Sequence, residues 1–330
     1  MARVVAPGAS RVSSRAVALT QTRHLPRSHT RVFELRPQPP FRLDLTAWAL
    51  RRRAQNAIDR WDAESYRRTL LVDGNPLEVA VTQLGEESST PRLEVVLSGP
   101  RVGPTAETEA RSTLARLLGL DVDVSGFYAR AARDSLLARL AERFRGVKPP
   151  RFPTMFECLL NAVACQQLSL AAGLTLLNRL AVAAGAPAGA PPAFPPPSNV
   201  LGLSRSALQT LGFSERKAGT ILELAEAAAA GELELEAFEH LDDAAVVEAL
   251  VRRRGIGPWS ADYVLLRGLG RLHVFPRGDS GALAGLRRFL VGTELADDPD
   301  AALRRWAPDA GLVYFHLLLH GLVGQVGVEG

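Results

Sequence analysis

The segment Arg254-Gly255-Ile256-Gly257-Pro258 constrains the fold more than any other part of the chain. Glycine accepts backbone angles that other residues avoid, and proline fits the first position of a helix, where its missing N–H costs nothing. The pattern predicts an abrupt hairpin between two helices, over about residues 243–269. The first of these helices should begin at Asp242-Asp243 and end at the arginines beside Gly255, charges that suit the helix dipole.

Such a hairpin offers a place for a phosphate group. Backbone N–H groups of Gly255, Ile256 and Gly257 and the start of the next helix would point outward, and they would bind a phosphate without reading base sequence. Arg254 would add attraction for a nucleic-acid backbone. An ordinary corner between two helices also explains both glycines, so the hairpin alone leaves DNA binding and a structural turn open.

Trp259 and Tyr263 lie four residues apart on the helix that follows the hairpin, so they project from one face. Packing in the core is the usual role of such a pair. The functional alternative is a stacking wall for a base turned out of a duplex, which suits a cationic base because aromatic faces attract positive charge.

Asp279 follows Gly278 and precedes a helical pattern formed by Leu283, Leu286 and Leu290. Aspartate is a preferred residue at a helix N-cap, which gives it a purely structural role. A carboxylate near an aromatic pocket can also stabilise an oxocarbenium-like sugar as a base departs, and orient a water for attack. One residue can fill both roles.

The elements predict an α+β fold. Within residues 39–102, the alternation at residues 41–46 predicts a half-buried strand, Tyr66–Val72 and Leu77–Val81 flank the hairpin signal Asp73-Gly74-Asn75, and Leu93–Leu97 predicts a further strand. Residues 103–330 form helical patterns. Thr154 and Glu157 form a capping box, which predicts the start of one helix. This helix is expected to end near Gln167, and Ser169 is expected to cap the next one.

Composition sets further limits. The net charge is +4, and the only lysines are Lys148 and Lys217. The only cysteines, Cys158 and Cys165, are too few for a zinc or iron–sulfur set and are consistent with a reducing compartment. Apolar runs are too short to span a bilayer. Residues 1–38 are expected to form a disordered basic tail, although an organelle transit peptide has a similar composition.

Several motifs in order resemble helix-hairpin-helix DNA glycosylases of the 3-methyladenine DNA glycosylase II (AlkA) type, over about residues 39–324. The resemblance depends on four segments, each weak alone but specific in their order and spacing: Phe156-Glu157-Cys158-Leu159-Leu160 with Gln166-Gln167, then Leu211-Gly212-Phe213-Ser214-Glu215-Arg216-Lys217-Ala218, then Gly255-Ile256-Gly257-Pro258-Trp259-Ser260-Ala261, and Phe275-Pro276 before Asp279.

The resemblance implies an N-terminal antiparallel-sheet domain and a mainly helical body divided by the substrate cleft. It makes Asp279 the catalytic residue, places Trp259 and Tyr263 in the base pocket, and gives the hairpin at Gly255–Gly257 a backbone phosphate, often with a monovalent cation on its carbonyl oxygens. Gln167 would be the wedge that fills the gap left by the flipped nucleotide, where the residues alone suggest only a solvated helix end.

The resemblance also implies the setting of the reaction. The partner is double-stranded DNA with a damaged base, bound by a monomeric bacterial enzyme of the cytoplasm, associated with the nucleoid. No cofactor and no metal held by side chains are expected.

Two positions bear on the subclass. Members that also nick the strand carry a lysine where this chain has Trp259, because a Schiff base needs an amine. Neither lysine is expected near that place, so a monofunctional enzyme that leaves an abasic site is predicted. Asp309 stands where related enzymes often have an aromatic residue; it could attract a cationic base, reshape the pocket, or cap a helix after Pro308.

Three functions remain open. The first is a glycosylase for alkylated purines such as 3-methyladenine, whose positive charge makes them good leaving groups. The second is a DNA-binding module without catalysis. The third is a glycosylase for a neutral lesion such as hypoxanthine or uracil.

Overall fold

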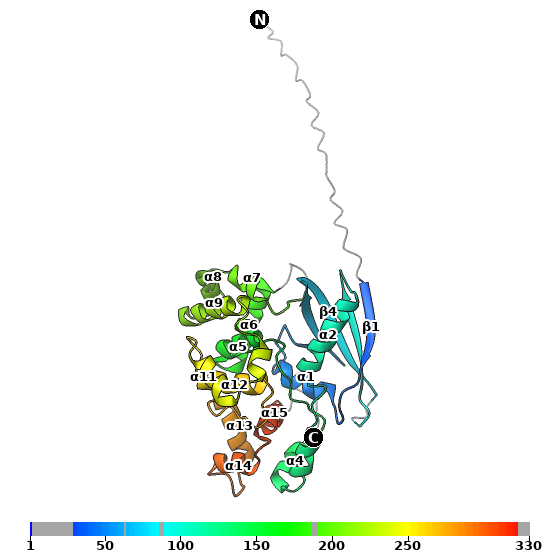
Figure 1. Ribbon diagram of the computed structural model, residues 1–330, viewed down its shortest axis with the longest axis vertical. Helices are drawn as coiled ribbons and strands as arrows, with labels where there is room; N and C mark the ends of the chain where they lie inside the picture. The colour runs from blue at the N-terminus through cyan, green and yellow to red at the C-terminus, as the bar shows by residue number, and fades with distance from the viewer. Residues whose placement is uncertain (2–28, 63, 86–88, 186–190, 323–330) are drawn as a thin grey trace.

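The computed structural model describes residues 1, 29–62, 64–85, 89–185 and 191–322. A sheet and a mainly helical body lie side by side (Figure 1). The predicted α+β class is confirmed. The predicted division at residues 102 and 103 stays a prediction, although the last strand of the sheet does end at Gly99.

The sheet has five strands in the order β1-β5-β4-β3-β2, and every neighbouring pair is antiparallel. The predicted hairpin is confirmed: Asp73 and Gly74 turn the chain with φ angles of 48° and 72°, as a two-residue turn of this kind requires. The predicted strand at Leu93–Leu97 is confirmed within β5. The strands are β1 His29–Leu35, β2 Arg60–Asp62, β3 Ser65–Val72, β4 Asn75–Leu84 and β5 Arg92–Gly99.

Two predictions for this part of the chain are wrong. Residues 29–35, assigned to the basic tail, form the edge strand β1, held by backbone pairing with β5 while most of its side chains stay exposed. The rest of the predicted tail, residues 2–28, lies outside the described residues. Residues 43–46, assigned to a strand, begin helix α1, Leu43–Arg51. This helix is buried on nearly every side between the sheet and α15, so no polar face reveals its period.

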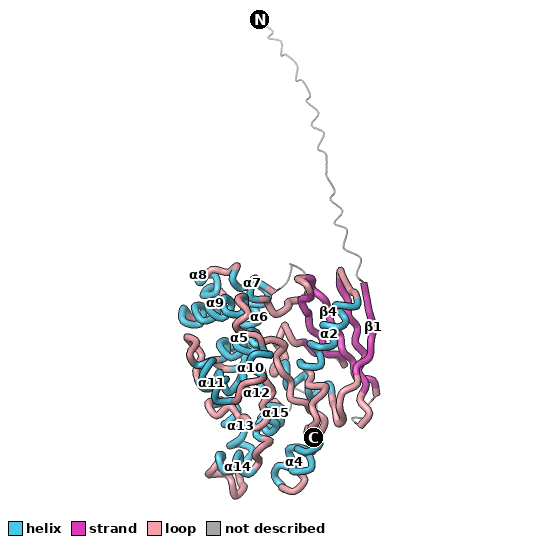
Figure 2. Tube along the Cα trace, viewed as in Figure 1, coloured by secondary structure: helices cyan, strands magenta, loops and turns pink. Residues whose placement is uncertain are grey.

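Most of the helices lie to one side of the sheet (Figure 2). They pack around two cores. The first helical core joins mainly α5 to α12, and the second joins α1, α3, α4 and α13 to α15. Helix α2 covers one face of the sheet. The helices are α2 Pro104–Leu117, α3 Ser125–Ala131, α4 Ser135–Arg143, α5 Met155–Cys165, α6 Leu170–Ala184, α7 Pro197–Leu201, α8 Arg205–Thr210, α9 Glu215–Ala229, α10 Leu235–Glu239, α11 Asp243–Val251, α12 Pro258–Arg267, α13 Ser280–Leu290, α14 Pro299–Arg305 and α15 Ala310–His320.

The predicted helix starts at Thr154 and Ser169 are confirmed. The Thr154 hydroxyl accepts a hydrogen bond from the Glu157 N–H at 3.1 Å, and Ser169 does the same for Ala172 at 3.2 Å. The capping box is only half formed, because the Glu157 carboxylate turns away from the cap and binds Arg68 of β3. Among the described residues, no helix is long and apolar enough to cross a membrane.

Candidate active site

A cleft of about 1170 Å³ opens between the two helical cores. Helices α5, α6, α9 and α12 of the first core line it on one side, and α13 and α15 of the second core line the other. The end of α1 supplies Arg52 and Arg53. A concave site of this size at the junction of several elements is a typical place for a ligand.

The predicted hairpin joins α11 and α12, and one of its glycines is required by geometry. Gly255 has a φ angle of 82°, and a Cβ added there would lie 2.1 Å from Oγ1 of Thr220. Gly257 is different from the prediction: its φ of −109° is open to any residue, and a Cβ there would meet nothing within 4 Å. Glycine at this position leaves open space above the backbone; it is not required by an unusual backbone angle.

Core packing and hydrogen bonds fix the conformation of the hairpin. Ile256 is buried in the first helical core, and its N–H donates to the carbonyl of Arg253 at 3.1 Å, so this N–H is used within the turn. The Gln166 amide donates to the Gly255 carbonyl and to the Ser260 hydroxyl, both at 2.9 Å. Gln166 therefore ties the hairpin to the end of α5, a role that the sequence did not reveal.

Gly255→Ala is expected to lower the free energy of unfolding by about 1–3 kcal/mol, because it combines a left-handed backbone with a clash against Thr220. Gly257→Ala, two residues further on in the same hairpin, should leave stability within about 0.5 kcal/mol of the native value. Chemical denaturation of both variants measures the difference. Equal stability of the two would show that the Thr220 contact does not constrain the hairpin.

Trp259 and Tyr263 both line the cleft, and their ring centroids lie 5.6 Å apart. Tyr263 is also part of the first helical core, so it both packs and faces the cleft. Its hydroxyl accepts a hydrogen bond from Arg52 Nη1 at 3.1 Å, and burial raises the pKa of Tyr263 to about 12. The two residues form an apolar wall that ends in a phenol held in its neutral form.

Asp279 is the N-cap of α13, which confirms its structural role, and it also lines the cleft. Its catalytic role stays a prediction. Oδ1 accepts a hydrogen bond from the Ala282 N–H at 2.8 Å. The Tyr314 hydroxyl lies 3.4 Å from Oδ2 and donates to it. Burial, and then the charge of Asp279, raise the pKa of Tyr314, which keeps this phenol protonated as a donor.

Gln167 is exposed at the junction of α5 and α6, on the lining of the cleft. Its φ of 55° is a left-handed conformation, which is uncommon outside glycine and is concentrated at functional sites. Leu168 beside it is 46% exposed, an apolar side chain at the cleft that sequence reasoning missed. A left-handed residue directly after a helix is also a common way for a helix to end, so the wedge role of Gln167 stays a prediction.

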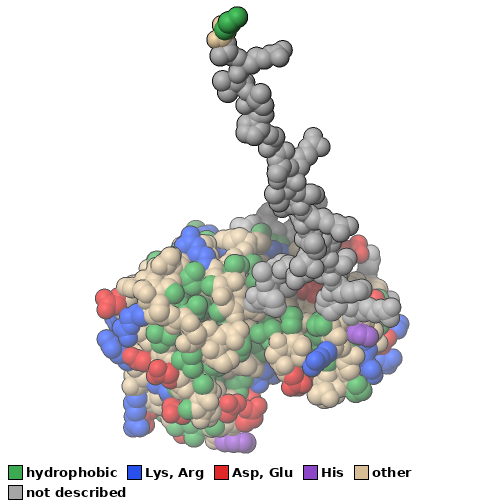
Figure 3. Space-filling model, turned by 90° about the horizontal axis from the view of Figure 1, so that it is seen from above, with side chains coloured by type: hydrophobic (Ala, Val, Ile, Leu, Met, Phe, Trp, Pro, Cys, Tyr) green, Lys and Arg blue, Asp and Glu red, His purple; other side chains and the backbone are tan. Residues whose placement is uncertain are grey.

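Arg254 lies outside the lining of the cleft, in a neighbouring groove with Arg205 and Arg216. Its side chain is exposed, with one guanidinium nitrogen 3.7 Å from a Glu223 carboxylate oxygen. On the face that carries α7 and α8, basic and acidic side chains are interspersed along the rim (Figure 3). The lining of the cleft, in contrast, is predominantly basic.

Within the described lining of the cleft, the only carboxylate is Asp279, against five basic side chains: Arg52, Arg53, Arg216, Lys217 and Arg288. Lys217 lines the same cleft as Trp259, but the prediction that no lysine stands at the place of Trp259 stays a prediction. Its ammonium donates to the carbonyls of Ala164 and Gln166 at 3.0 and 2.8 Å, and burial lowers its pKa. Lys148 lies elsewhere and donates to the Val122 carbonyl.

Asp309 does not line the cleft. Both of its carboxylate oxygens bind the guanidinium of Arg130, at 2.6 and 2.7 Å, and the residue is only 5% exposed. It occupies the N-cap position of α15 without a side-chain capping bond. The interpretation of Asp309 as an attractor for a cationic base is wrong, because Arg130 holds the carboxylate outside the cleft. The predicted N-cap position is confirmed, but the side chain makes no capping hydrogen bond.

The part of the chain that the structure describes holds no group of three or more His, Cys, Asp or Glu side chains arranged for a metal ion. Cys158 and Cys165 are free thiols, and burial raises the pKa of both.

Two family models match the chain in succession. The AlkA N-terminal domain matches residues 32–153, and the HhH-GPD superfamily of base excision DNA repair proteins matches residues 160–307. In Bacillus subtilis, YfjP, provisionally named a DNA-3-methyladenine glycosylase, is 28% identical over 82% of this chain and 92% of its own length. DNA-3-methyladenine glycosylase 2 of Escherichia coli is 25% identical over 84% of this chain and 91% of its own.

A solved structure shares the fold. The 3-methyladenine DNA-glycosylase from Archaeoglobus fulgidus superimposes with a TM-score of 0.73 at 24% identity, covering 88% of this chain and 98% of that one. The order of the two family matches repeats the order of sheet and helical body, and the second match contains the hairpin and Asp279. The chain belongs to the helix-hairpin-helix superfamily of DNA glycosylases and is of the AlkA type.

Proposed function

We propose that the protein is a monofunctional glycosylase that removes alkylated purines such as 3-methyladenine from double-stranded DNA and leaves an abasic site. The observation that carries the proposal is the position of Asp279, whose carboxylate faces the cleft together with the Trp259–Tyr263 wall. The names of the bacterial relatives support the substrate class.

The geometry suits a base that has left the duplex. Trp259 and Tyr263 supply a stacking surface, and Asp279 supplies the negative charge that stabilises an oxocarbenium-like sugar. Water then attacks C1′ while the base leaves, and the Asp279 carboxylate orients that water and takes its proton. Tyr314 and the Ala282 N–H hold the carboxylate in a fixed orientation.

The DNA itself would be bound around this cleft. The space above Gly257 and the start of α12 suit a backbone phosphate, and Arg254 and Arg216 add positive charge in the neighbouring groove. Gln167 would occupy the gap left by the flipped nucleotide, which its exposed position on the lining of the cleft supports. A monomer is sufficient for these contacts.

The direct test is release of free base from a methylated duplex, scored together with strand nicking in the absence of heat or alkali. Base release with intact strands is the expected result. Binding to abasic DNA without any release would instead favour the non-catalytic module.

Lys217 provides the sharpest check on the monofunctional mechanism, because it is the amine that lines the cleft. Two carbonyls hold its ammonium, and Trp259 stands where a strand-nicking relative carries its lysine. Borohydride reduction during the reaction is expected to trap no covalent protein–DNA adduct. An adduct formed by the native protein and lost in Lys217→Met would assign a Schiff base to Lys217 and overturn this part of the proposal.

A further inference from the structure

Lys217 of α9 holds the turn that carries Gln167. Helix α5 ends at Cys165, and the last carbonyls of a helix lack hydrogen-bond partners within it. The Lys217 ammonium donates to the carbonyl of Ala164 at 3.0 Å and to that of Gln166 at 2.8 Å. The two carbonyls belong to the residues on either side of Cys165, directly before Gln167. A cation from another helix therefore fixes the backbone that leads into Gln167.

Two further elements hold the same turn. The side-chain amide of Gln166 donates to the Gly255 carbonyl of the hairpin at 2.9 Å, while the backbone carbonyl of Gln166 accepts from Lys217. Helix α6 packs directly on the end of α5, because a Cβ added to Gly173 would lie 2.6 Å from the Cys165 sulfur. The turn is thus fixed by α9, by the hairpin and by α6.

The backbone of Gln167 needs such support. Its φ of 55° is left-handed, which is unfavourable for a residue with a Cβ and persists where the surrounding structure holds it. A charged donor binds a carbonyl more strongly than a neutral donor does, so Lys217 is well suited to hold this conformation. The Gln167 side chain is exposed on the lining of the cleft and projects from this fixed turn.

Resting on the proposed function and on the predicted wedge role of Gln167, we propose that Lys217 is a positioning residue for the wedge. It holds Gln167 in the orientation that enters the gap left by the flipped nucleotide. A group that is already ordered loses less freedom when it enters the duplex, so more of its interaction energy is left to keep the nucleotide out. The effect of Lys217 on base release passes through Gln167.

A purely structural role for Lys217 makes a different prediction. A cation at the end of a helix stabilises that helix through its carbonyls and its dipole, whatever residue follows. Such a role acts whether or not residue 167 carries a glutamine side chain. A positioning role for Lys217 disappears when the Gln167 side chain is removed.

The test is a double-variant cycle of Lys217→Met and Gln167→Ala, measured as single-turnover base release from a methylated duplex. Lys217→Met is expected to lower the rate about tenfold, the size of effect that follows loss of a hydrogen bond to a charged group. Gln167→Ala should lower it at least as much. The double variant should release base as slowly as Gln167→Ala alone, because residues that act as one unit are not additive.

Lys217→Arg carries the test if Lys217→Met does not fold. It keeps the charge and donors to carbonyls but changes their geometry, so we expect a drop of about threefold. This drop should also vanish when Gln167→Ala is already present.

Lys148→Met is the matched control, because Lys148 is the other lysine of the chain. Its ammonium also donates to a backbone carbonyl, that of Val122 at 2.6 Å, and the residue is fully buried. It does not line the cleft. The variant should lower stability in chemical denaturation and leave the rate of base release unchanged.

A second measurement separates flipping from bond cleavage. 2-Aminopurine placed beside the damaged base fluoresces more strongly when it is unstacked, so its signal rises as the nucleotide leaves the duplex. Lys217→Met is expected to reduce this rise, and Lys148→Met is not. A slower release in Lys217→Met with a native fluorescence rise would place Lys217 in bond cleavage and overturn the inference.

The remaining outcomes separate the inference from the proposed function. Rates that multiply in the double variant assign Lys217 a structural role, and a native rate in either single variant removes the wedge or its support. Each of these overturns the inference and leaves the proposed function standing. No base release by the native protein overturns the proposed function and the inference with it.

Discussion

Asp279→Asn is expected to lower the rate of base release about a thousandfold while the protein keeps its stability. Loss of the negative charge removes both stabilisation of the sugar cation and the acceptor for the water proton, effects worth about 10²–10⁴ in rate. Asparagine caps helices as well as aspartate does, so the bond to the Ala282 N–H is kept. Single-turnover base release from a methylated duplex, alongside thermal unfolding, measures both quantities.

Asp298→Asn is the matched control for this experiment. Asp298 caps α14 through the Ala301 N–H at 2.8 Å, as Asp279 caps α13, but it does not line the cleft. Its replacement should change neither stability nor rate. A native rate of release in Asp279→Asn would show that Asp279 is only a helix cap and that another group drives the reaction.

Features specified by neighbouring residues were predictable from the sequence. The caps at Thr154 and Ser169, the turn at Asp73-Gly74 and the hairpin before Pro258 each depend on a few adjacent positions. Local chemistry decides such elements whatever surrounds them. The position of Asp279 at a helix start was predictable for the same reason.

The groups that sequence reasoning missed depend on distant partners. Arg52 stands in a run of three arginines at a helix end, a pattern typical of solvated charge, and its burial follows from Asn161 and Tyr263 more than a hundred residues away. The environment of Asp309 was missed for the same reason, because its partner Arg130 lies 179 residues before it. Helix α1 was misassigned since its sides face two cores and leave no polar stripe.

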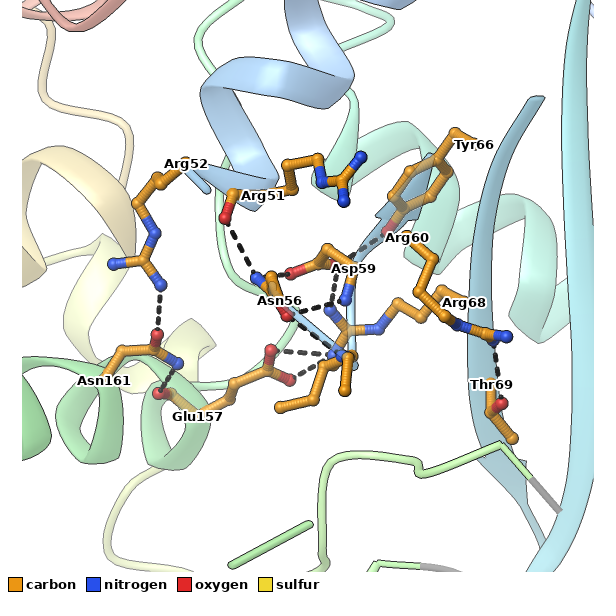
Figure 4. Close-up of polar contacts among 12 residues, drawn as sticks. Arg51, Arg52, Asn56, Asp59, Arg60, Tyr66, Arg68, Thr69, Glu157 and Asn161 are labelled. Atoms are coloured by element: carbon orange, nitrogen blue, oxygen red, sulfur yellow. Dashed lines mark hydrogen bonds and ion pairs between the residues drawn. The ribbon is translucent and has the colours of Figure 1, made fainter. Parts of the chain in front are cut away.

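Arg68→Met is expected to destabilise the protein by about 3–5 kcal/mol, because it strands two buried carboxylates. Arg68 of β3 binds Asp59 Oδ1 at 2.7 Å and Glu157 Oε2 of α5 at 2.6 Å, and all three side chains are 3% exposed (Figure 4). The contacts join the sheet to the helical body. Chemical denaturation at neutral pH measures the loss.

Arg60→Met tests whether burial is the cause. Arg60 pairs with Glu78 at 2.9 Å on the same sheet, but its side chain is 25% exposed, so its loss should cost at most about 1 kcal/mol. Equal losses in the two variants would contradict the assignment of the large effect to buried, unpaired charge.

The pH dependence of the Arg68→Met deficit gives a second check. Burial raises the pKa of Glu157 above its ordinary value of 4.5 even with Arg68 present, and removal of Arg68 should raise it further. A carboxyl group whose pKa is higher in the folded state stabilises the fold while it is protonated, and that stability is lost as the pH rises through the folded pKa. The deficit should therefore be largest at neutral pH and shrink as the pH approaches 4.5.

Adding Glu157→Gln to Arg68→Met should recover part of the loss at neutral pH, because glutamine has the shape of the carboxylate without its charge. Asn161 lies one turn after Glu157 on α5 and holds Arg52, so the double variant also separates stability from activity. If charge alone causes the deficit, the double variant regains part of its stability. The rate of base release then reports separately whether Asn161 still holds Arg52 in place. A double variant no more stable than Arg68→Met would place the cause in lost packing of the arginine stem.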